Sequence, residues 1–242
     1  MPQIVQRGFL PDDNIQFSDA AMQTLLRAQR EICFLLDHGF EMEKTVTFVG
    51  NHYQLSARQR MALTRASSSQ AQLEERAKKR ISGALDGRQV QIDGFNLIIT
   101  LETALSASTL LCCMDGTARD LCGLHGTYRL IDKTEPAVCL ILEELRRRGA
   151  ASAWFWLDAP VSNSGRLRGE IVRLAREMDF PAEVQLVPNA DAMLWEQDCA
   201  VTSDAVILDR CGSWVNLARE IIDARLPGRC FVKLDGGDPP SD

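Results

Sequence analysis

The chain has 242 residues, of which 45% are hydrophobic and 25% are charged, so it can bury the core of a globular protein. The net charge of −6 argues against a protein that coats nucleic acid indiscriminately. No apolar run approaches the roughly 18 residues of a membrane span, and the first residues lack the pattern of a secretion signal, so we expect a cytoplasmic protein.

Charge is distributed unevenly along the chain. Residues 1–88 hold 12 basic and 10 acidic side chains, whereas the remainder holds 15 and 23. Within residues 58–80 there are seven basic side chains against two acidic ones. An acidic C-terminal part, preceded by this basic segment (the basic collar, residues 58–80), suits a carboxylate metal site whose anionic substrate is attracted by the cationic segment. A solvated helix face explains the basic run equally well when this run is taken alone.

The first 80 residues show apolar positions at helical spacing, and glycines or serines interrupt the pattern. The segment Ser56–Gln59 has the pattern of a capping box, which opens a helix. The predicted helices span Ser18–Leu36, Glu43–Val49, Ser56–Arg65 and Gln70–Ile81. We therefore predict a small all-helical domain over residues 1–85.

Beyond residue 88, strand and helix patterns alternate. The predicted strands are Gln89–Ile92, Ala153–Leu157, Val184–Val187 and Ala200–Thr202. The predicted helices are Leu97–Leu105, Pro136–Arg148, Ser164–Met178, Asp191–Gln197 and Trp214–Ala224. The run Ser108–Met114 fits a strand or a buried helix segment, and Val206–Leu208 is another short apolar run. This alternation predicts an α/β domain over residues 86–242, with a mostly parallel sheet flanked by helices.

Aspartates stand at the ends of several of these strands. Asp93, Asp158 and Asp204 each follow a predicted strand, and Asp191 opens the helix after another. The carboxyl ends of parallel strands meet at one edge of a sheet, and clustered carboxylates suit Mg²⁺ or Mn²⁺. A single aspartate after a strand is commonly a helix cap. Four at corresponding strand ends are harder to attribute to caps alone.

The order of these motifs resembles that of the PIN-like nucleases, especially their NYN branch. The resemblance is carried by Asp93–Asn96, Asp158, Asp191 and Thr202–Asp204, and it covers about residues 88–225. It implies that the two strand-end aspartates and the Asp of the Thr-Ser-Asp turn hold one or two divalent ions. It also implies a further catalytic carboxylate at the start of the intervening helix, a polar positioning role for Asn96, and RNA as substrate.

Polar and cationic side chains near the aspartates are candidate substrate contacts. Thr202 and Ser203 add hydroxyls that could orient a carboxylate or a metal-bound water, and Ser162 and Ser164 either cap the next helix or present hydroxyls to phosphate. The helical domain would hold RNA by phosphate contacts that carry little sequence information. Its candidates are Arg58, Arg60, Arg65, Lys78, Lys79 and Arg80.

Residues 101–135 depart from the nuclease pattern as an insertion. It contains Arg119, His125 and Arg129, which could neutralise or protonate a phosphate. Ion pairs with neighbouring aspartates are the alternative for the two arginines, and a packing role is the alternative for the histidine.

Taken together, the sequence favours a ribonuclease dependent on Mg²⁺ or Mn²⁺. The main alternative is a catalytically inactive adaptor of the same fold, in which the helical domain docks RNA, a protein partner or a second copy of the chain. A helix-turn-helix DNA regulator built on residues 40–66 is a weaker alternative. Residues 1–80 also resemble a small helical domain that occurs beside such nuclease domains, and this likeness implies no function.

Overall fold

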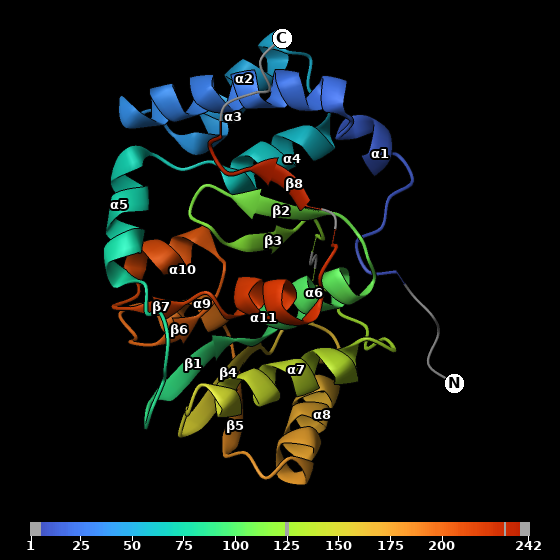
Figure 1. The fold of residues 1–242 in the computed structure, drawn as a ribbon, viewed down its shortest axis with the longest axis vertical. Coiled ribbons are helices and arrows are strands. Elements are labelled where there is room, and N and C mark those ends of the chain that lie inside the picture. The colour runs from blue at the N-terminus through green and yellow to red at the C-terminus, as the bar shows by residue number, and fades with distance from the viewer. Residues whose placement is uncertain (1–5, 124–125, 230, 238–242) are drawn as a thin grey trace.

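The structure is a computed structural model that describes residues 6–123, 126–229 and 231–237. Within these ranges, helices lie in an upper layer, a small sheet lies beneath them, and a larger sheet with its own helices lies below (Figure 1). None of the described helices is both long and apolar enough to span a bilayer.

The N-terminal part is all-helical, and the four helices predicted there are confirmed. Two of them begin with capping boxes, formed by Ser56 with Gln59 and by Ser69 with Gln72. In each, the serine side chain accepts a hydrogen bond from the glutamine backbone amide, and the glutamine side chain accepts one from the serine backbone amide. A short helix before them was not predicted. The helices are α1 Asp13–Gln16, α2 Asp19–Asp37, α3 Met42–His52, α4 Ala57–Ala66 and α5 Gln70–Lys79.

A five-stranded, all-parallel sheet follows in the order β5-β4-β1-β6-β7, which confirms the predicted fold class. Its strands are β1 Gln89–Asp93, β4 Ser152–Asp158, β5 Ala182–Val187, β6 Ala200–Val201 and β7 Trp214–Val215. The associated helices are α6 Gly94–Leu105, α7 Thr134–Arg147, α8 Ser164–Glu177, α9 Ala190–Leu194, α10 Ala205–Arg210 and α11 Leu217–Arg225. Separate apolar clusters cover the two faces, one including residues of α6, α7, α8 and α11 and the other residues of α9 and α10.

Some predicted boundaries were wrong, and the structure assigns the two apolar runs whose type the sequence left open. The segment Trp214–Val215 pairs with β6 as a strand, so the last helix starts only at Leu217. The run Val206–Leu208 lies in a helix, and Ser108–Met114 contains a strand. Helix α6 starts at Gly94, where an added Cβ would lie 2.5 Å from a Leu157 methyl carbon, so the helix start packs closely on β4.

A second sheet, of order β3-β2-β8, separates the helical layer from the parallel sheet (Figure 1). Its strands are β2 Leu110–Cys113, β3 Ala118–Asp120 and β8 Phe231–Leu234, and β3 and β8 were not predicted. Leu111 and Leu234 share one apolar cluster with Leu25 and Leu63 of the helical layer. The insertion and the C-terminal strand therefore pack directly against the N-terminal helices.

Candidate active site

The predicted aspartates line one cavity of about 500 Å³ at the carboxyl edge of the parallel sheet. Asp93 ends β1, Asp158 ends β4, Asp191 lies in the first turn of α9, and Asp204 precedes α10. Because these strands are parallel, residues more than 100 positions apart reach the same edge. The convergence inferred from strand ends is thus present in the fold.

Asp93 is the most perturbed of these carboxyls. It is buried, and burial, followed by repulsion from Asp191 and Asp204, raises its pKa to about 8. The Thr202 hydroxyl donates a hydrogen bond of 2.9 Å to Asp93 Oδ2 and accepts one of 3.0 Å from the amide of Asp204. No well-formed capping hydrogen bond joins the Asp93 side chain to α6, although the backbone amide of Asn96 lies near enough to lower the pKa of this carboxyl. Its place in an acidic cluster is therefore not explained by helix capping.

The other aspartates combine cavity and backbone roles. The Asp204 carboxylate accepts hydrogen bonds from the amides of Val206 and Ile207, so it caps α10. The Asp158 carboxylate accepts one of 2.8 Å from the amide of Ala190. For Asp191, burial, then the charges of Asp204 and Asp158, raises the pKa. These carboxylates are close enough to repel one another even where they also hold backbone groups.

Asn96 and Ser203 fix the turn that leads to Asp204. Asn96 Oδ1 accepts hydrogen bonds from the Ser203 hydroxyl at 2.7 Å and from the Ser203 amide at 3.1 Å. The positioning role expected for Asn96 therefore has a structural basis, although its partner is the protein backbone and hydroxyl. Ser203 is buried and engaged in the same contact.

Another part of the cavity lining, which we call the wall, comes from the helical layer and the small sheet. It includes Thr64 and Arg65 of α4, Arg119 and Asp120 of β3, and Cys122. Thr64, Asp120 and Cys122 were not identified from sequence. Strand β3 is three residues long and shows no periodic pattern, and Thr64 lies on a helix whose sequence does not reveal which side meets the cavity. The cavity thus lies between two parts of the chain that the sequence treats separately.

Arg119 connects this wall to the edge of the parallel sheet that carries the aspartates. Its guanidinium donates hydrogen bonds to the carbonyl oxygens of Ser203 and Arg65 and forms an ion pair with Asp115. Burial disfavours its charge, but Asp115 and the nearby Asp204 outweigh this effect, so the pKa of Arg119 is raised. Of the alternatives for Arg119, the ion pair with Asp115 is formed.

The structure does not place the other insertion candidates in the cavity. The side chain of Arg129 is exposed and is not among the cavity-lining residues, while its carbonyl accepts a hydrogen bond of 2.6 Å from Arg7. His125 lies outside the described residues.

Ser162 and Ser164 are also outside the cavity lining. Ser162 Oγ accepts a hydrogen bond of 3.3 Å from the amide of Tyr128, and Ser164 Oγ donates one of 3.4 Å to the carbonyl of Ala159. Neither side chain caps α8, whose preceding residue is Asn163 with a φ of 63°. Both serines therefore connect loops beside the site.

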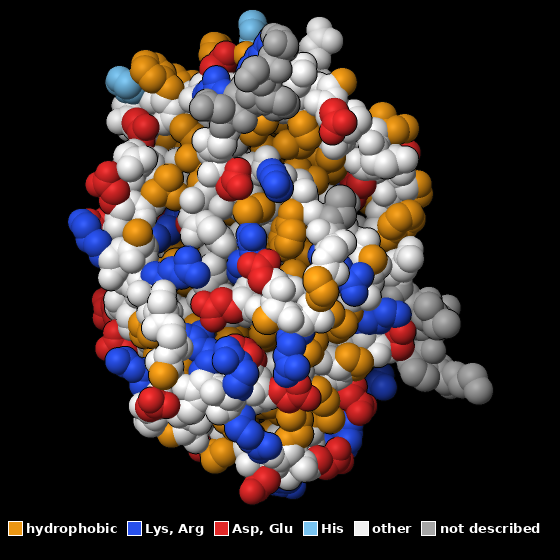
Figure 2. All heavy atoms as spheres, viewed as in Figure 1, with side chains coloured by type: hydrophobic (Ala, Val, Ile, Leu, Met, Phe, Trp, Pro, Cys, Tyr) orange, Lys and Arg blue, Asp and Glu red, His pale blue; other side chains and the backbone are white. Residues whose placement is uncertain are grey.

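Most side chains of the basic collar form ion pairs or hydrogen bonds within the protein. Arg58 forms an ion pair of 2.7 Å with Asp13 and donates to the carbonyl of Leu121, and Arg60 donates to the carbonyl of Leu55. On the face shown in Figure 2, basic and acidic side chains are interspersed over the surface. A continuous basic band is not visible on that face.

The basic end of α5 also has protein partners. Lys78 is exposed and pairs with Glu75 one turn earlier, and the Arg80 guanidinium lies 5.6 Å from the ring centre of Trp214. Neither residue lines the acidic cavity, and neither does Lys79. RNA contacts by this segment would have to lie outside that cavity.

Lys79 offers a test of its structural role. Its Nζ donates to the carbonyls of Leu208 and Asp209, near the C-terminal end of α10. We expect Lys79→Ala to lower the free energy of unfolding by about 1 kcal/mol, because these carbonyls lose a cationic donor. Lys78→Ala, its matched control, should leave urea unfolding unchanged. Equal effects of the two variants would contradict this assignment.

The donor set fits a hydrated divalent ion better than a closed metal cage. Carboxylate oxygens are the ligands that Mg²⁺ and Mn²⁺ prefer. Across the described residues, however, no three His, Cys, Asp or Glu side chains form a ready-made ligand group. Mg²⁺ commonly keeps several waters and uses only one or two protein carboxylates together with substrate phosphates. The cavity therefore suits an ion whose coordination the substrate completes.

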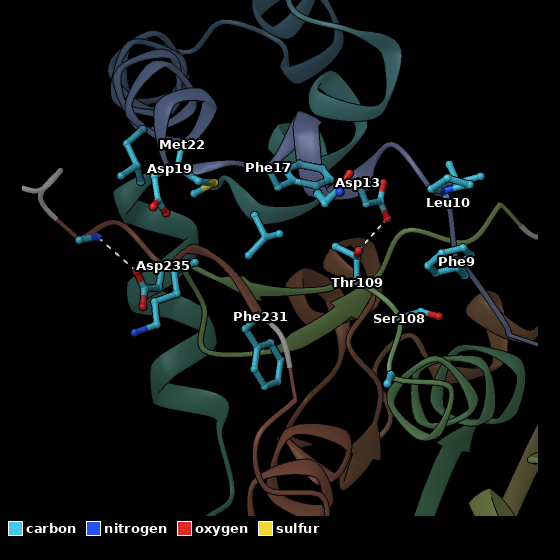
Figure 3. Close-up of a pocket in the computed structure, with 17 residues that line it drawn as sticks. Phe9, Leu10, Asp13, Phe17, Asp19, Met22, Ser108, Thr109, Phe231 and Asp235 are labelled. Atoms are coloured by element: carbon cyan, nitrogen blue, oxygen red, sulfur yellow. Dashed lines mark hydrogen bonds between the residues drawn. The ribbon is translucent and has the colours of Figure 1, made fainter.

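A larger cavity, of about 780 Å³, lies between α1, α2 and β8 (Figure 3). Phe9, Phe17 and Phe231 are among its mainly apolar lining residues. Its buried carboxylate, Asp13, accepts a hydrogen bond of 2.7 Å from Thr109 and is paired with an arginine. Asp19 and Asp235 also line it, but both are exposed, whereas the smaller cavity gathers its carboxylates around the buried Asp93.

Comparisons with known proteins identify two families. A family described as a domain of unknown function, DUF5616, matches residues 82–220, and one described as a protein of unknown function, DUF434, matches residues 24–79. An uncharacterized protein of Methanocaldococcus jannaschii is 31% identical over 184 residues, covering 75% of this chain and 88% of that protein. No solved structure matches the chain. The chain belongs to the DUF5616 family.

Proposed function

We propose that this protein is a metal-dependent ribonuclease whose catalytic centre is the aspartate cavity. The observation that carries the proposal is the convergence of Asp93, Asp158, Asp191 and Asp204 on one cavity at the carboxyl edge of a parallel sheet. Burying mutually repelling carboxylates is costly unless a cation offsets their charge. Backbone contacts account for Asp158 and Asp204, but they give no reason to bury Asp93 beside them.

The residues have distinct roles in this proposal. Asp93, Asp158 and Asp204 would hold Mg²⁺ or Mn²⁺, which supplies an activated water and charge stabilisation for attack on a phosphodiester. Asp191 would add negative charge and accept a proton, since burial and then the neighbouring charges raise its pKa. Thr202 and Asn96 hold the surrounding turn through the hydrogen bonds described above.

The finer assignment, a PIN-like nuclease of the NYN type, is supported by the order of the motifs and by the parallel sheet with helices on both faces. The choice of RNA over DNA, like the cytoplasmic location, is an inference from sequence. Incubation of purified protein with Mn²⁺ and both single-stranded and structured RNA tests the proposal. Failure to cut either RNA at every salt concentration would count heavily against it.

An inactive adaptor of the same fold is the second candidate. It is favoured by the backbone contacts of Asp158 and Asp204 and by the missing three-ligand group among the described side chains. Calorimetry distinguishes the two candidates. A nuclease should bind Mn²⁺ with a millimolar or lower Kd and lose this binding in Asp93→Asn, whereas the adaptor should show no such dependence.

The affinity for Mn²⁺ should depend strongly on pH. The pKa of Asp93 is raised to about 8, so the folded protein holds a proton there at neutral pH that a bound cation must displace. We expect the Kd to fall by up to about tenfold per pH unit between pH 6 and 8, as one released proton requires. Calorimetry in buffers of different ionisation enthalpy measures that proton. A Kd that stays constant over this range would contradict the prediction.

A further inference from the structure

Two cationic side chains line the aspartate cavity within the described parts of the chain, Arg65 and Arg119. Arg119 is 7% exposed and is occupied by Asp115 and by two carbonyl oxygens. The Arg65 side chain is 32% exposed and lines this cavity. The other basic residues considered for RNA binding do not line it.

The guanidinium of Arg65 is fixed mainly by neutral acceptors. Nη1 donates to the carbonyl of Asp120 and Nη2 to the carbonyl of Cys122. The Asp120 carboxylate lies farther away, at 3.3 Å, and it also accepts hydrogen bonds from Thr100 and from the amide of Cys122. Arg65 is therefore held in place by two carbonyl oxygens and by an ion pair with Asp120. These contacts use at most three of its five N–H donors, so others remain for a ligand.

Arg65 is also tied to the aspartate edge of the sheet. One guanidinium, that of Arg119, donates both to the carbonyl of Arg65 and to the carbonyl of Ser203, the residue before Asp204. This bridge holds the backbone of α4 beside the turn that carries Asp204. A residue of the helical layer thus lines the same cavity as carboxylates of the parallel sheet.

We propose that Arg65 is the phosphate contact of this site, so that the helical layer and the α/β part form one composite active site. The proposal rests on the nuclease function inferred above. A phosphodiester that enters an acidic cavity needs positive charge that the aspartates cannot supply. A guanidinium can donate two parallel hydrogen bonds to phosphate, and Arg65 lines the cavity that the aspartates also line.

The test uses the full chain with Arg65→Gln and the charge-conserving Arg65→Lys. RNA binding is measured in Ca²⁺ over a series of salt concentrations, cleavage in Mn²⁺, and Mn²⁺ affinity without RNA. Arg65→Gln should weaken RNA binding about tenfold at low salt and reduce the salt slope by about one counterion. Arg65→Lys should restore most of both, and the affinity for Mn²⁺ should be unchanged.

Lys44→Gln is the control, because Lys44 is an exposed cation of the same helical layer that pairs with Glu41 and does not line the cavity. It should keep the RNA affinity and salt slope of the wild type. If Arg65→Gln keeps both as well while the wild type cleaves RNA, the inference about Arg65 is overturned and the nuclease function stands.

Two further outcomes separate the inference from the function. Binding that depends on Arg65 in a wild type without cleavage would support the phosphate contact and overturn the nuclease. If Arg65→Gln loses affinity for both Mn²⁺ and RNA, Arg65 maintains the structure of the site and does not contact phosphate. This result also overturns the inference. A wild type that binds no RNA at low salt overturns both.

Discussion

Replacing Asp93 with asparagine should abolish RNA cleavage and at the same time stabilise the metal-free protein. The loss of activity follows from the loss of a proposed metal ligand, and we expect kcat to fall at least about a thousandfold, roughly 4 kcal/mol of transition-state stabilisation. The gain in stability follows from burial and repulsion, since Asp93 is buried near Asp191 and Asp204. Asparagine keeps an oxygen that can accept the hydrogen bond from Thr202.

The stabilisation should grow with pH. The folded protein keeps the proton on Asp93 up to about pH 8, whereas an unfolded aspartate ionises near its ordinary pKa of 3.8. Wild-type stability is therefore lost as pH rises from about 4 to about 8, and the asparagine variant is spared this loss. At pH 8 the variant should gain at least about 1.4 kcal/mol, the equivalent of one pKa unit.

Urea unfolding at pH 5 and pH 8 without metal measures this difference. Asp223→Asn is the control, because Asp223 is exposed on α11 and lies outside the cavity. Added Mn²⁺ should stabilise the wild type by about 2.7 kcal/mol at a hundred times its Kd and should not stabilise Asp93→Asn. A metal-free variant that unfolds more easily than the wild type at pH 8 would show that Asp93 is a structural anchor.

The convergence of the aspartates could be predicted because each of them follows a local pattern. An apolar run marks a strand, and an aspartate marks its carboxyl end, as at Asp93 and Asp158. Parallel pairing then brings these ends to one edge whatever the exact strand order. The sequence of one strand and the residue at its end are therefore enough to predict that a side chain reaches this edge.

The small sheet could not be predicted for the opposite reason. Strand β8 pairs with β2 across about 120 residues, as in the pair Leu110 and Phe231. Its four residues and the three of β3 are too short for a clear period. Strand β7, formed by Trp214 and Val215, is shorter still and merges with the helical pattern that follows. These strands depend on partners that are distant in sequence.

The roles of the arginines on α4 could not be predicted from sequence for a related reason. Arg58, Arg60 and Arg65 lie on one face or another of α4 and look alike in the sequence. Their partners come from α1, the loop after α3 and the chain after β3, respectively. Only the packing of these elements decides which guanidinium reaches the cavity.

The buried charges behind the cavity should make one aspartate critical for stability. Asp115 is paired with both Arg76 and Arg119, and all three side chains are nearly inaccessible to solvent. Asp115→Asn should lower the free energy of unfolding by about 3–5 kcal/mol, because two buried guanidinium groups lose their shared carboxylate. Arg76 keeps its ion pair with Asp209, so the larger penalty should fall on Arg119.

A double-mutant cycle with Arg119→Met tests this assignment at pH 7 by urea unfolding. Removing the unpaired charge should recover part of the loss, so Asp115→Asn combined with Arg119→Met should be less damaging than the two single effects added together. Glu75→Gln, which breaks only the exposed pair with Lys78, should cause no measurable change. Strictly additive effects would mean that Asp115 and Arg119 stabilise the fold independently. In that case the charge pair would not be what holds the carbonyl of Ser203, and with it the turn to Asp204, against the helical layer.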